Sequence, residues 1–463
     1  MRSDDLVARV KDGLARSGVS EAEVYVLAKE RGFARFAMGD LGQHMHVREP
    51  CVTARVAVGR RVAEAVTARL DPEGIVEVLR RAESSARLAP ESEAFDGFAG
   101  PSDVGPEPPA LDRFAARTAD ATAEKRVELV APLLEKVRAR GFVCAGILET
   151  TTSTEAVVTT RGCARGARAT TATFKLWATE TAGAGGAAGY GGAVHRDVDA
   201  LDLEGETERA IRICTDSRNP VAMDAGSYDV VFEPEAVSEL LEWLSATAFS
   251  AADVEQGMGA VAGRKGSRVT GEGVTIVEDP LDAGVTGFGA PFDREGVSRR
   301  RVALITAGVA EDILFDRAHG KRMGASSTGS AVPPTFGAEG GIAATSIHLA
   351  PGTHEDVASL VAGIDRGLYV CRLHYVNGYV EPKRAVMTGL TRDGCFLVEK
   401  GKITRPVGNL RFTESFLEAL SRCDGMTKSP KAIPTWWSEN GATVTPAVRM
   451  RGFRFSSGSA VRS

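Results

Sequence analysis

Alternation of side chains between residues 368 and 407 constrains the fold of this chain more than any other feature. Every second position from Tyr369 to Tyr375 falls on one face of an extended chain, the two-residue period of a strand. Residue pairs that favour tight turns follow at Asn377-Gly378, Asp393-Gly394 and Lys400-Gly401. The pattern predicts an antiparallel meander over residues 368–407, so the C-terminal part is expected to be rich in strands.

Proline and acidic residues between Glu91 and Pro109 mark the clearest change of composition along the chain. In the first part, helical spacing at 4–17 and 72–88 flanks an alternating region at 23–67, which predicts a small antiparallel sheet. The expected fold class is α+β. The expected parts are an N-terminal α+β domain (1–90), a Pro-rich linker (91–110), a central α/β domain (111–220) and a β-rich C-terminal domain (226–463).

Helix signals are clearest at two places in the C-terminal domain. A helix is expected over 234–246, where Glu233 and Glu235 suit the positive end of the helix dipole and Pro234 suits the first turn. A second helix is expected over 354–366, with Thr353 as the N-cap. The central domain is expected to hold the elements that remain, which are helices near 111–120, 123–140 and 203–215 and strands near 143–148, 155–160 and 169–179.

Charge and cysteine usage exclude several classes of protein. The net charge is −5 over 463 residues and no block of like charges occurs, which argues against a nucleic-acid surface. No apolar run reaches the roughly 18 residues that suggest a membrane-spanning helix, and no secretory signal is visible. The seven cysteines are scattered and never form a CxxC pair, as expected for reduced thiols in a cytoplasmic protein.

Other candidate motifs have simpler interpretations. The glycine-rich stretch Gly183–Gly192 lacks the spacing of a nucleotide loop and is interpreted as a flexible surface loop. His44 and His46 would share a face of a strand, but no further ligand follows at a recognisable spacing, so a solvent-facing pair is favoured over a metal site. Cys371 and His374 are three residues apart and would point to opposite faces of one strand, which argues against a catalytic dyad.

Several stretches of the chain resemble the TldD/PmbA (TldD/TldE) peptidase family. The C-terminal matches are Gly367–Asn377, Met387–Gly394, Gly401–Ile403 and Asn409–Ser415. Supporting matches lie at Ser327–Gly329, Leu349–Gly352 and Tyr228–Pro234. The sequence also departs from the family at Ser330, in the segment 333–341 and at Trp436-Trp437, which is compatible with a specialised paralogue.

The resemblance implies two kinds of subunit. The TldD kind carries HExxxH on the first helix of its C-terminal domain and a late cysteine as zinc ligands, whereas the TldE (PmbA) kind lacks them. The three motif positions correspond here to Glu242, Trp243 and Thr247, and no cysteine occurs after Gly425. Catalytic zinc needs three protein ligands and a base for its water. The resemblance therefore implies a TldE-like chain without a cofactor of its own, with zinc only in a partner.

The implied function is that of a non-catalytic subunit in a cytosolic peptidase. Its partner would be a TldD-like zinc subunit, and the substrate a short, unfolded or modified peptide bound as an added strand. Arg372, Tyr375 and Asn377 are candidates for substrate or interface contacts, although they could equally serve the sheet and its Asn-Gly turn. Two alternatives remain open, which are a paralogue repurposed for natural-product or modified-peptide biosynthesis and a homodimeric binding or scaffold protein.

Overall fold

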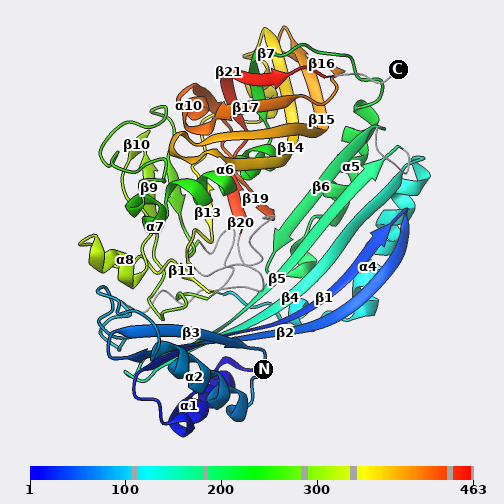
Figure 1. The fold of residues 1–463 in the computed structure, drawn as a ribbon. Helices are drawn as coiled ribbons and strands as arrows, with labels where there is room; N and C mark the ends of the chain where they lie inside the picture. The colour runs from blue at the N-terminus through cyan, green and yellow to red at the C-terminus, as the bar shows by residue number, and fades with distance from the viewer. Residues whose placement is uncertain (107–111, 181–185, 283–289, 334–340, 435–441, 460–463) are drawn as a thin grey trace.

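The fold consists of a long curved sheet whose hollow side faces a β-rich C-terminal part (Figure 1). The structure is a computed structural model. It describes residues 1–106, 112–180, 186–282, 290–333, 341–434 and 442–459. The mixed architecture confirms the predicted α+β class. No helix among these residues is long and apolar enough to cross a bilayer.

Six antiparallel strands form the curved sheet in the order β3-β2-β1-β4-β5-β6. Their bounds are β1 (Ala22–Ala37), β2 (Asp40–Val58), β3 (Arg61–Thr67), β4 (Val143–Thr159), β5 (Ala164–Thr179) and β6 (Ala188–His195). β1 pairs with β4, so one sheet joins the predicted 1–90 and 111–220 parts. The domain bounds themselves stay a prediction, but the expected small sheet at 23–67 is half of a larger one.

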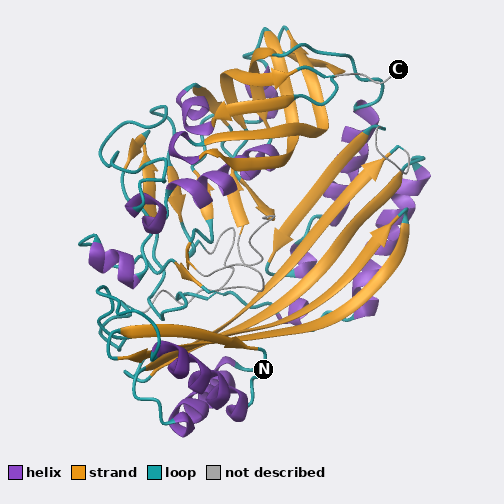
Figure 2. Cartoon of the chain, viewed as in Figure 1, coloured by secondary structure: helices purple, strands orange, loops and turns teal. Residues whose placement is uncertain are grey.

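Helices cover the outer face of this sheet (Figure 2). They are α1 (Ser3–Ser17), α2 (Pro72–Ala86), α4 (Ala123–Ala139) and α5 (Leu203–Asp216), close to their predicted bounds. α4 and α5 pack against alternate residues of β5, including Phe174 and Leu176, while α1 and α2 pack against β1 and β2. Because side chains alternate along a strand, Lys175 and Trp177 face the opposite, hollow side.

The glycine-rich stretch is not only a surface loop. Residues 188–192 belong to β6, whereas 181–185 lie outside the described residues. A Cβ atom at Gly191 would overlap the carbonyl oxygen of Glu206, and one at Gly189 would overlap that of Ala210. These glycines therefore allow α5 to approach β6 closely.

Five strands of the C-terminal part close on themselves in the order β14-β7-β21-β17-β15, since β15 also pairs with β14. Their bounds are β7 (Gly226–Phe232), β14 (Arg366–Glu381), β15 (Val386–Glu399), β17 (Arg411–Ser415) and β21 (Val448–Ser457). β16 (Lys402–Pro406) and β18 (Cys423–Met426) extend this sheet. The helix α6 (Pro234–Ala248) contributes to the largest apolar core together with these strands.

A second C-terminal sheet has the order β10-β9-β8-β13-β20-β19. Its strands are β8 (Ile276–Glu278), β9 (Val302–Thr306), β10 (Val309–Ala310), β13 (Ile347–Leu349), β19 (Lys431–Pro434) and β20 (Ala442–Thr445). The remaining elements are α3 (Ala116–Ala119), η1 (Val198–Ala200), α7 (Ala251–Glu255), α8 (Arg317–Arg322), β11 (Ala331–Val332), β12 (Gly341–Ile342), α9 (Val357–Val361), η2 (Pro382–Arg384) and α10 (Phe416–Ser421).

The predicted meander forms, but two of the three turns predicted for it were wrong. Asn377-Gly378 lies within β14, and the chain reverses later, through η2. Asp393-Gly394 lies within β15, where both residues have positive φ at an irregularity opposite Cys371. Lys400-Gly401 is the turn into β16, as predicted.

The predicted helix over 354–366 was also too long. Only residues 357–361 are helical, and Asp356 is the N-cap in place of Thr353. The Asp356 carboxylate accepts the backbone N–H of Ser359, whose hydroxyl is in turn within 3.3 Å of the Asp356 nitrogen. This local capping box outweighs the alternative start at Thr353.

Candidate functional site

The helix α6 carries the three positions of interest and separates the closed strands from the second C-terminal sheet. Its sequence gives it an apolar stripe, and Val237, Leu240, Leu241 and Leu244 are all at most 1% exposed. Between these positions, Glu239 lies 4.0 Å from Arg372, and Glu242 interacts electrostatically with Lys175 of the curved sheet. The helix thus presents polar positions at a boundary between the two halves of the chain.

Trp243 and Thr247 are occupied with packing and helix contacts. The Trp243 ring lies edge-on to the ring of Tyr379 in β14, with centroids 5.2 Å apart. It also covers Gly378, where a Cβ atom would come within 2.8 Å of the indole. The buried Thr247 hydroxyl donates a hydrogen bond to the carbonyl oxygen of Trp243 at 2.7 Å. Neither side chain is positioned as a metal ligand or a base.

Glu242 interacts electrostatically with Lys175 of β5. Burial lowers the pKa of the Lys175 amine, and the negative charge of Glu242 acts against that shift. Lys175 lies on the hollow face of the curved sheet, whereas Glu242 belongs to the C-terminal part. The two charges therefore interact across the boundary between the curved sheet and the C-terminal part.

Arg372 is buried at the junction of the two halves. Its guanidinium forms an ion pair with Asp393 and lies 4.8 Å from the ring centroid of Tyr190 and 5.4 Å from that of Trp177. Trp177 donates its indole N–H to Asp393 Oδ2 at 3.1 Å. One Nη of Arg372 is also 4.0 Å from Glu239 of α6. The side chain ties β14 and β15 to β5 and β6.

The structure does not bring the three predicted contact residues together. Arg372 is 3% exposed, whereas Tyr375 is 79% exposed and lies within β14 with φ of 50°. Asn377 is exposed, and its side-chain oxygen accepts the backbone N–H of Tyr379 at 2.8 Å. Their role in substrate or interface contacts stays a prediction, and for Arg372 the geometry adds a contact between the halves.

A buried group of charged side chains at the start of α6 was not predicted from the sequence. Arg209 of α5 donates to Glu233 and to Glu235, and Lys431 of β19 donates to Glu235 at 2.8 Å and to Glu206. Burial opposes the charge of Arg209, yet the two carboxylates outweigh it and raise the pKa of the guanidinium. Glu233 and Glu235 were interpreted only as helix-dipole partners, because nothing in the sequence pairs them with a residue of α5.

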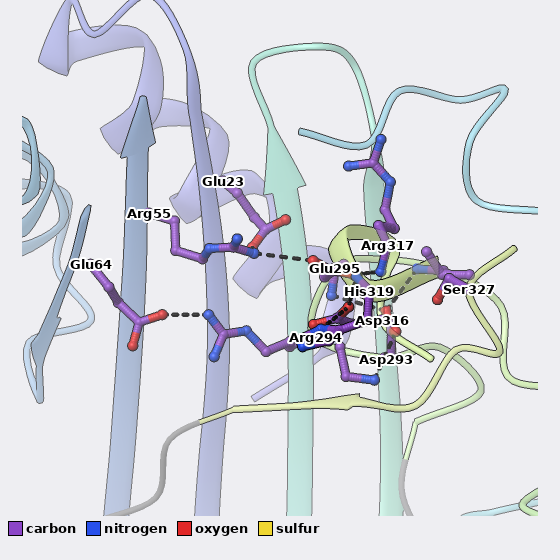
Figure 3. A network of polar contacts seen from close by, with 12 residues as sticks. Glu23, Arg55, Glu64, Asp293, Arg294, Glu295, Asp316, Arg317, His319 and Ser327 are labelled. Atoms are coloured by element: carbon purple, nitrogen blue, oxygen red, sulfur yellow. Dashed lines mark hydrogen bonds and ion pairs between the residues drawn. The ribbon is translucent and has the colours of Figure 1, made fainter. Parts of the chain in front are cut away.

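A second polar network joins strands β1 and β2 of the curved sheet to the C-terminal part (Figure 3). Arg55 of β2 bonds to Glu23 of β1 at 3.1 Å and to Glu295 at 3.2 Å. The neighbouring Asp293 carboxylate accepts the backbone N–H groups of Glu295, Val297 and Ala331. Burial, reinforced by the charge of Glu295, raises the pKa of Asp293 to about 7.

Among the residues that the structure covers, no three His, Cys, Asp or Glu side chains gather as a metal site. His44 and His46 are exposed on β2, as the sequence suggested. Cys423 is half-buried, and burial raises the pKa of its thiol to about 11. Trp436 and Trp437, and most of the atypical segment 333–341, lie outside the described residues.

Comparison with known proteins identifies the class. The family model described as the PmbA/TldA metallopeptidase C-terminal domain matches residues 225–457, half of the chain. The chain therefore belongs to the TldD/PmbA metallopeptidase family. This result confirms the resemblance seen in the sequence.

Particular relatives agree with this assignment. A metalloprotease of Methanothermobacter thermautotrophicus is 26% identical over 275 residues, covering 58% of this chain and 57% of that protein. A metalloprotease TldD homologue of Haemophilus influenzae is 27% identical over 160 residues, which cover 35% of this chain and 32% of that protein. The chain thus matches little more than half the length of the first relative and a third of the second.

Solved structures extend the likeness in fold to the whole chain. TldE of Thermococcus kodakarensis has a TM-score of 0.85 at 19% identity, covering 98% of this chain and 99% of that one. A candidate modulator of a DNA gyrase from Thermotoga maritima has a TM-score of 0.83 at 18% identity, covering 98% and 100%. At this identity the likeness establishes the fold alone.

Proposed function

We propose that this chain is a zinc-free, non-catalytic subunit that pairs with a zinc-bearing homologue to form a peptidase for short, unfolded or modified peptides. The observation that carries the proposal is the state of the three positions on α6. Glu242 is the one possible metal ligand among them. Trp243 has no group that could take a proton from water, and its ring is packed against Tyr379.

The residues present do not fit catalytic zinc. Such a site uses three protein ligands and leaves the fourth position to water or substrate. Thr247 would have to give up its hydrogen bond to the Trp243 carbonyl, and a neutral hydroxyl is a poor ligand for zinc. Glu242 alone cannot hold the ion, so no step of a zinc-dependent reaction is assigned to this chain.

Two sheet edges that lie close together support a role in peptide binding. β6 ends the strand order of the curved sheet, and β19 ends that of the second C-terminal sheet, within the part of the chain that the structure describes. Val194 of β6 and Ala432 of β19 belong to one small apolar cluster, so the two edges lie close together. An extended peptide can add to a sheet edge through main-chain hydrogen bonds, which requires little sequence preference.

The relatives support pairing with a second kind of subunit. The chain shares its fold with a protein named TldE, and it has sequence similarity to a metalloprotease TldD homologue. A TldE-like chain that lacks the zinc ligands needs a subunit that supplies them. The exposed Tyr375 of β14 is a candidate contact for that subunit.

Co-expression tests this proposal. The chain is produced alone, and together with a homologue from the same genome that carries HExxxH, and each preparation is assayed on short peptides and on an unfolded protein. We expect hydrolysis only from the complex. Replacing the motif Glu of the partner by Gln should abolish hydrolysis, whereas Glu242→Gln in this chain should leave it within about twofold, because Glu242 is not the base. Hydrolysis of the peptides or of the unfolded protein by this chain alone, or loss of peptide hydrolysis in Glu242→Gln with the complex intact, would contradict the proposal.

A further inference from the structure

Ser346, His348 and Asp282 are arranged as a nucleophile, a base and an orienting carboxylate. Ser346 Oγ lies 3.0 Å from His348 Nε2, within hydrogen-bond reach. On the other side of the ring, His348 Nδ1 lies 3.7 Å from Asp282 Oδ2. A separation of this kind is common in ligand-free sites, where such contacts shorten when substrate binds. These residues are not part of the zinc motif, and the proposed function does not use them.

Strand pairing shows which way the histidine faces. His348 pairs with Val277 of β8 and with Val444 of β20, so the three side chains share one face of the second C-terminal sheet. Ile347 and Leu349 face the other way, into the core that contains α6. Ala442 shares the face of Val444 and packs with Val194 of β6. His348 therefore faces the curved sheet.

The local charges keep the imidazole suited to act as a base. Burial lowers the pKa of His348, Asp282 and Asp279 act against that shift, and Arg301 adds to it. The result is a neutral ring at pH 7, which can accept a proton from the Ser346 hydroxyl. Asp279 is itself paired with Arg301 at 3.3 Å.

The backbone around the serine is held by a buried carboxylate. Glu278 accepts the backbone N–H of Thr345 at 2.8 Å and that of Ser346 at 3.1 Å, which fixes the serine on its strand. Arg113 donates to the carbonyl oxygen of Pro280 at 3.3 Å, so a guanidinium lies beside the segment that carries Asp282. Arg299 also acts electrostatically on Glu278. These contacts fix the backbone at Ser346 and in the segment just before Asp282.

We propose that Ser346, His348 and Asp282 form a hydrolytic site for small acyl esters that needs neither zinc nor a partner subunit. Ser346 Oγ attacks the ester carbonyl carbon while its proton passes to His348 Nε2. The C–O bond of the ester breaks, and the leaving alcohol takes the proton from His348. Water then attacks the acyl-serine, returns a proton through His348 to Oγ, and releases the carboxylic acid.

A fluorophosphonate probe tests this site directly, because Oγ displaces fluoride from phosphorus and stays phosphonylated. The full-length chain is treated alone, in the presence of a chelator, and analysed by intact mass and peptide mapping. We expect one adduct per chain, on Ser346. The rate of labelling should rise with pH, with a midpoint below the 6.5 of an ordinary imidazole. His348→Gln should slow labelling by about 100-fold.

Matched variants separate the site from general reactivity. Ser346→Ala should abolish the adduct, and Ser330→Ala should keep it, since Ser330 is equally buried but its hydroxyl contacts Thr328 in place of a histidine. Hydrolysis of p-nitrophenyl acetate should follow the same order. An unlabelled wild-type chain, or an adduct that persists in Ser346→Ala, overturns the proposal whether or not the variants fold. Because the assay uses no zinc and no partner, its failure leaves the proposed pairing unaffected.

Discussion

The indole of Trp243 lies edge-on to the phenol ring of Tyr379, with 5.2 Å between the ring centroids. The pair joins α6 to β14 and covers Gly378. Under the proposed function, this aromatic contact occupies the position at which the zinc-bearing partner has its general base.

Removing the indole should destabilise the chain. Trp243→Ala deletes a half-buried ring together with its aromatic contact, and we expect a loss of roughly 3 kcal/mol in the free energy of unfolding. Tyr375→Ala, at an exposed position of β14, should change the free energy of unfolding by less than about 0.5 kcal/mol. Urea unfolding of both variants measures the difference. Equal losses of unfolding free energy in the two variants would show that the contact between Trp243 and Tyr379 does not stabilise the chain.

Arg372 is expected to be needed for docking of the two halves. Arg372→Met leaves the buried Asp393 carboxylate without its main cation, and breaking a buried ion pair in this way costs about 3–5 kcal/mol. Arg392→Met is the matched control, because Arg392 is half exposed and lies 3.7 Å from the same carboxylate. The control should cost at most about 1 kcal/mol. Thermal unfolding and limited proteolysis between the halves report the outcome, and equal losses in the two variants would refute this role.

Because α5 approaches β6 closely, we expect that replacing Gly191 by a larger residue destabilises the chain. Gly191→Ala would place a methyl group against the Glu206 carbonyl, so the helix must shift and the free energy of unfolding should fall by about 1–3 kcal/mol. Gly42→Ala, where no atom lies within 4 Å of the added carbon, should have little effect. Chemical unfolding distinguishes the two. A neutral Gly191→Ala would mean that α5 does not depend on this glycine.

Asp293 should make stability depend on pH. Its folded pKa of about 7 lies above the ordinary value of 3.8, so between these limits the folded chain binds more protons than the unfolded chain. Stability from this group is therefore largest at low pH and falls as pH rises toward 7. Asp293→Asn should flatten the fall in the free energy of unfolding between pH 5 and 8, whereas Asp4→Asn, which removes an exposed carboxyl, should not. An unchanged slope in Asp293→Asn would contradict this assignment.

Local patterns in the sequence predicted much of the secondary structure. The stripe of α6 and the bounds of α1, α2, α4 and α5 follow from helical spacing, and the Lys400-Gly401 turn follows from turn chemistry. The Asn377-Gly378 turn failed because β14 continues past it, with Gly378 held under Trp243. Tertiary packing decided that position, and local turn preference could not reveal it.

The candidate site was less accessible to sequence reasoning. The motif positions on α6 could be found because they lie on one helix at a known spacing. Arg209 and Glu235, like Ser346 and Asp282, come from separate elements, and only the fold brings them together. Ionic and polar contacts between distant elements leave no periodic signal in one sequence.

Zinc content tests the central proposal most directly. The isolated chain and its complex with an HExxxH-bearing homologue are purified without added metal, and zinc is measured against protein by elemental mass spectrometry. We predict no stoichiometric zinc in the isolated chain and one zinc per heterodimer, lost when the partner's motif histidines are replaced. One zinc per chain in the isolated protein, or zinc that remains in the complex after that replacement, would contradict the account.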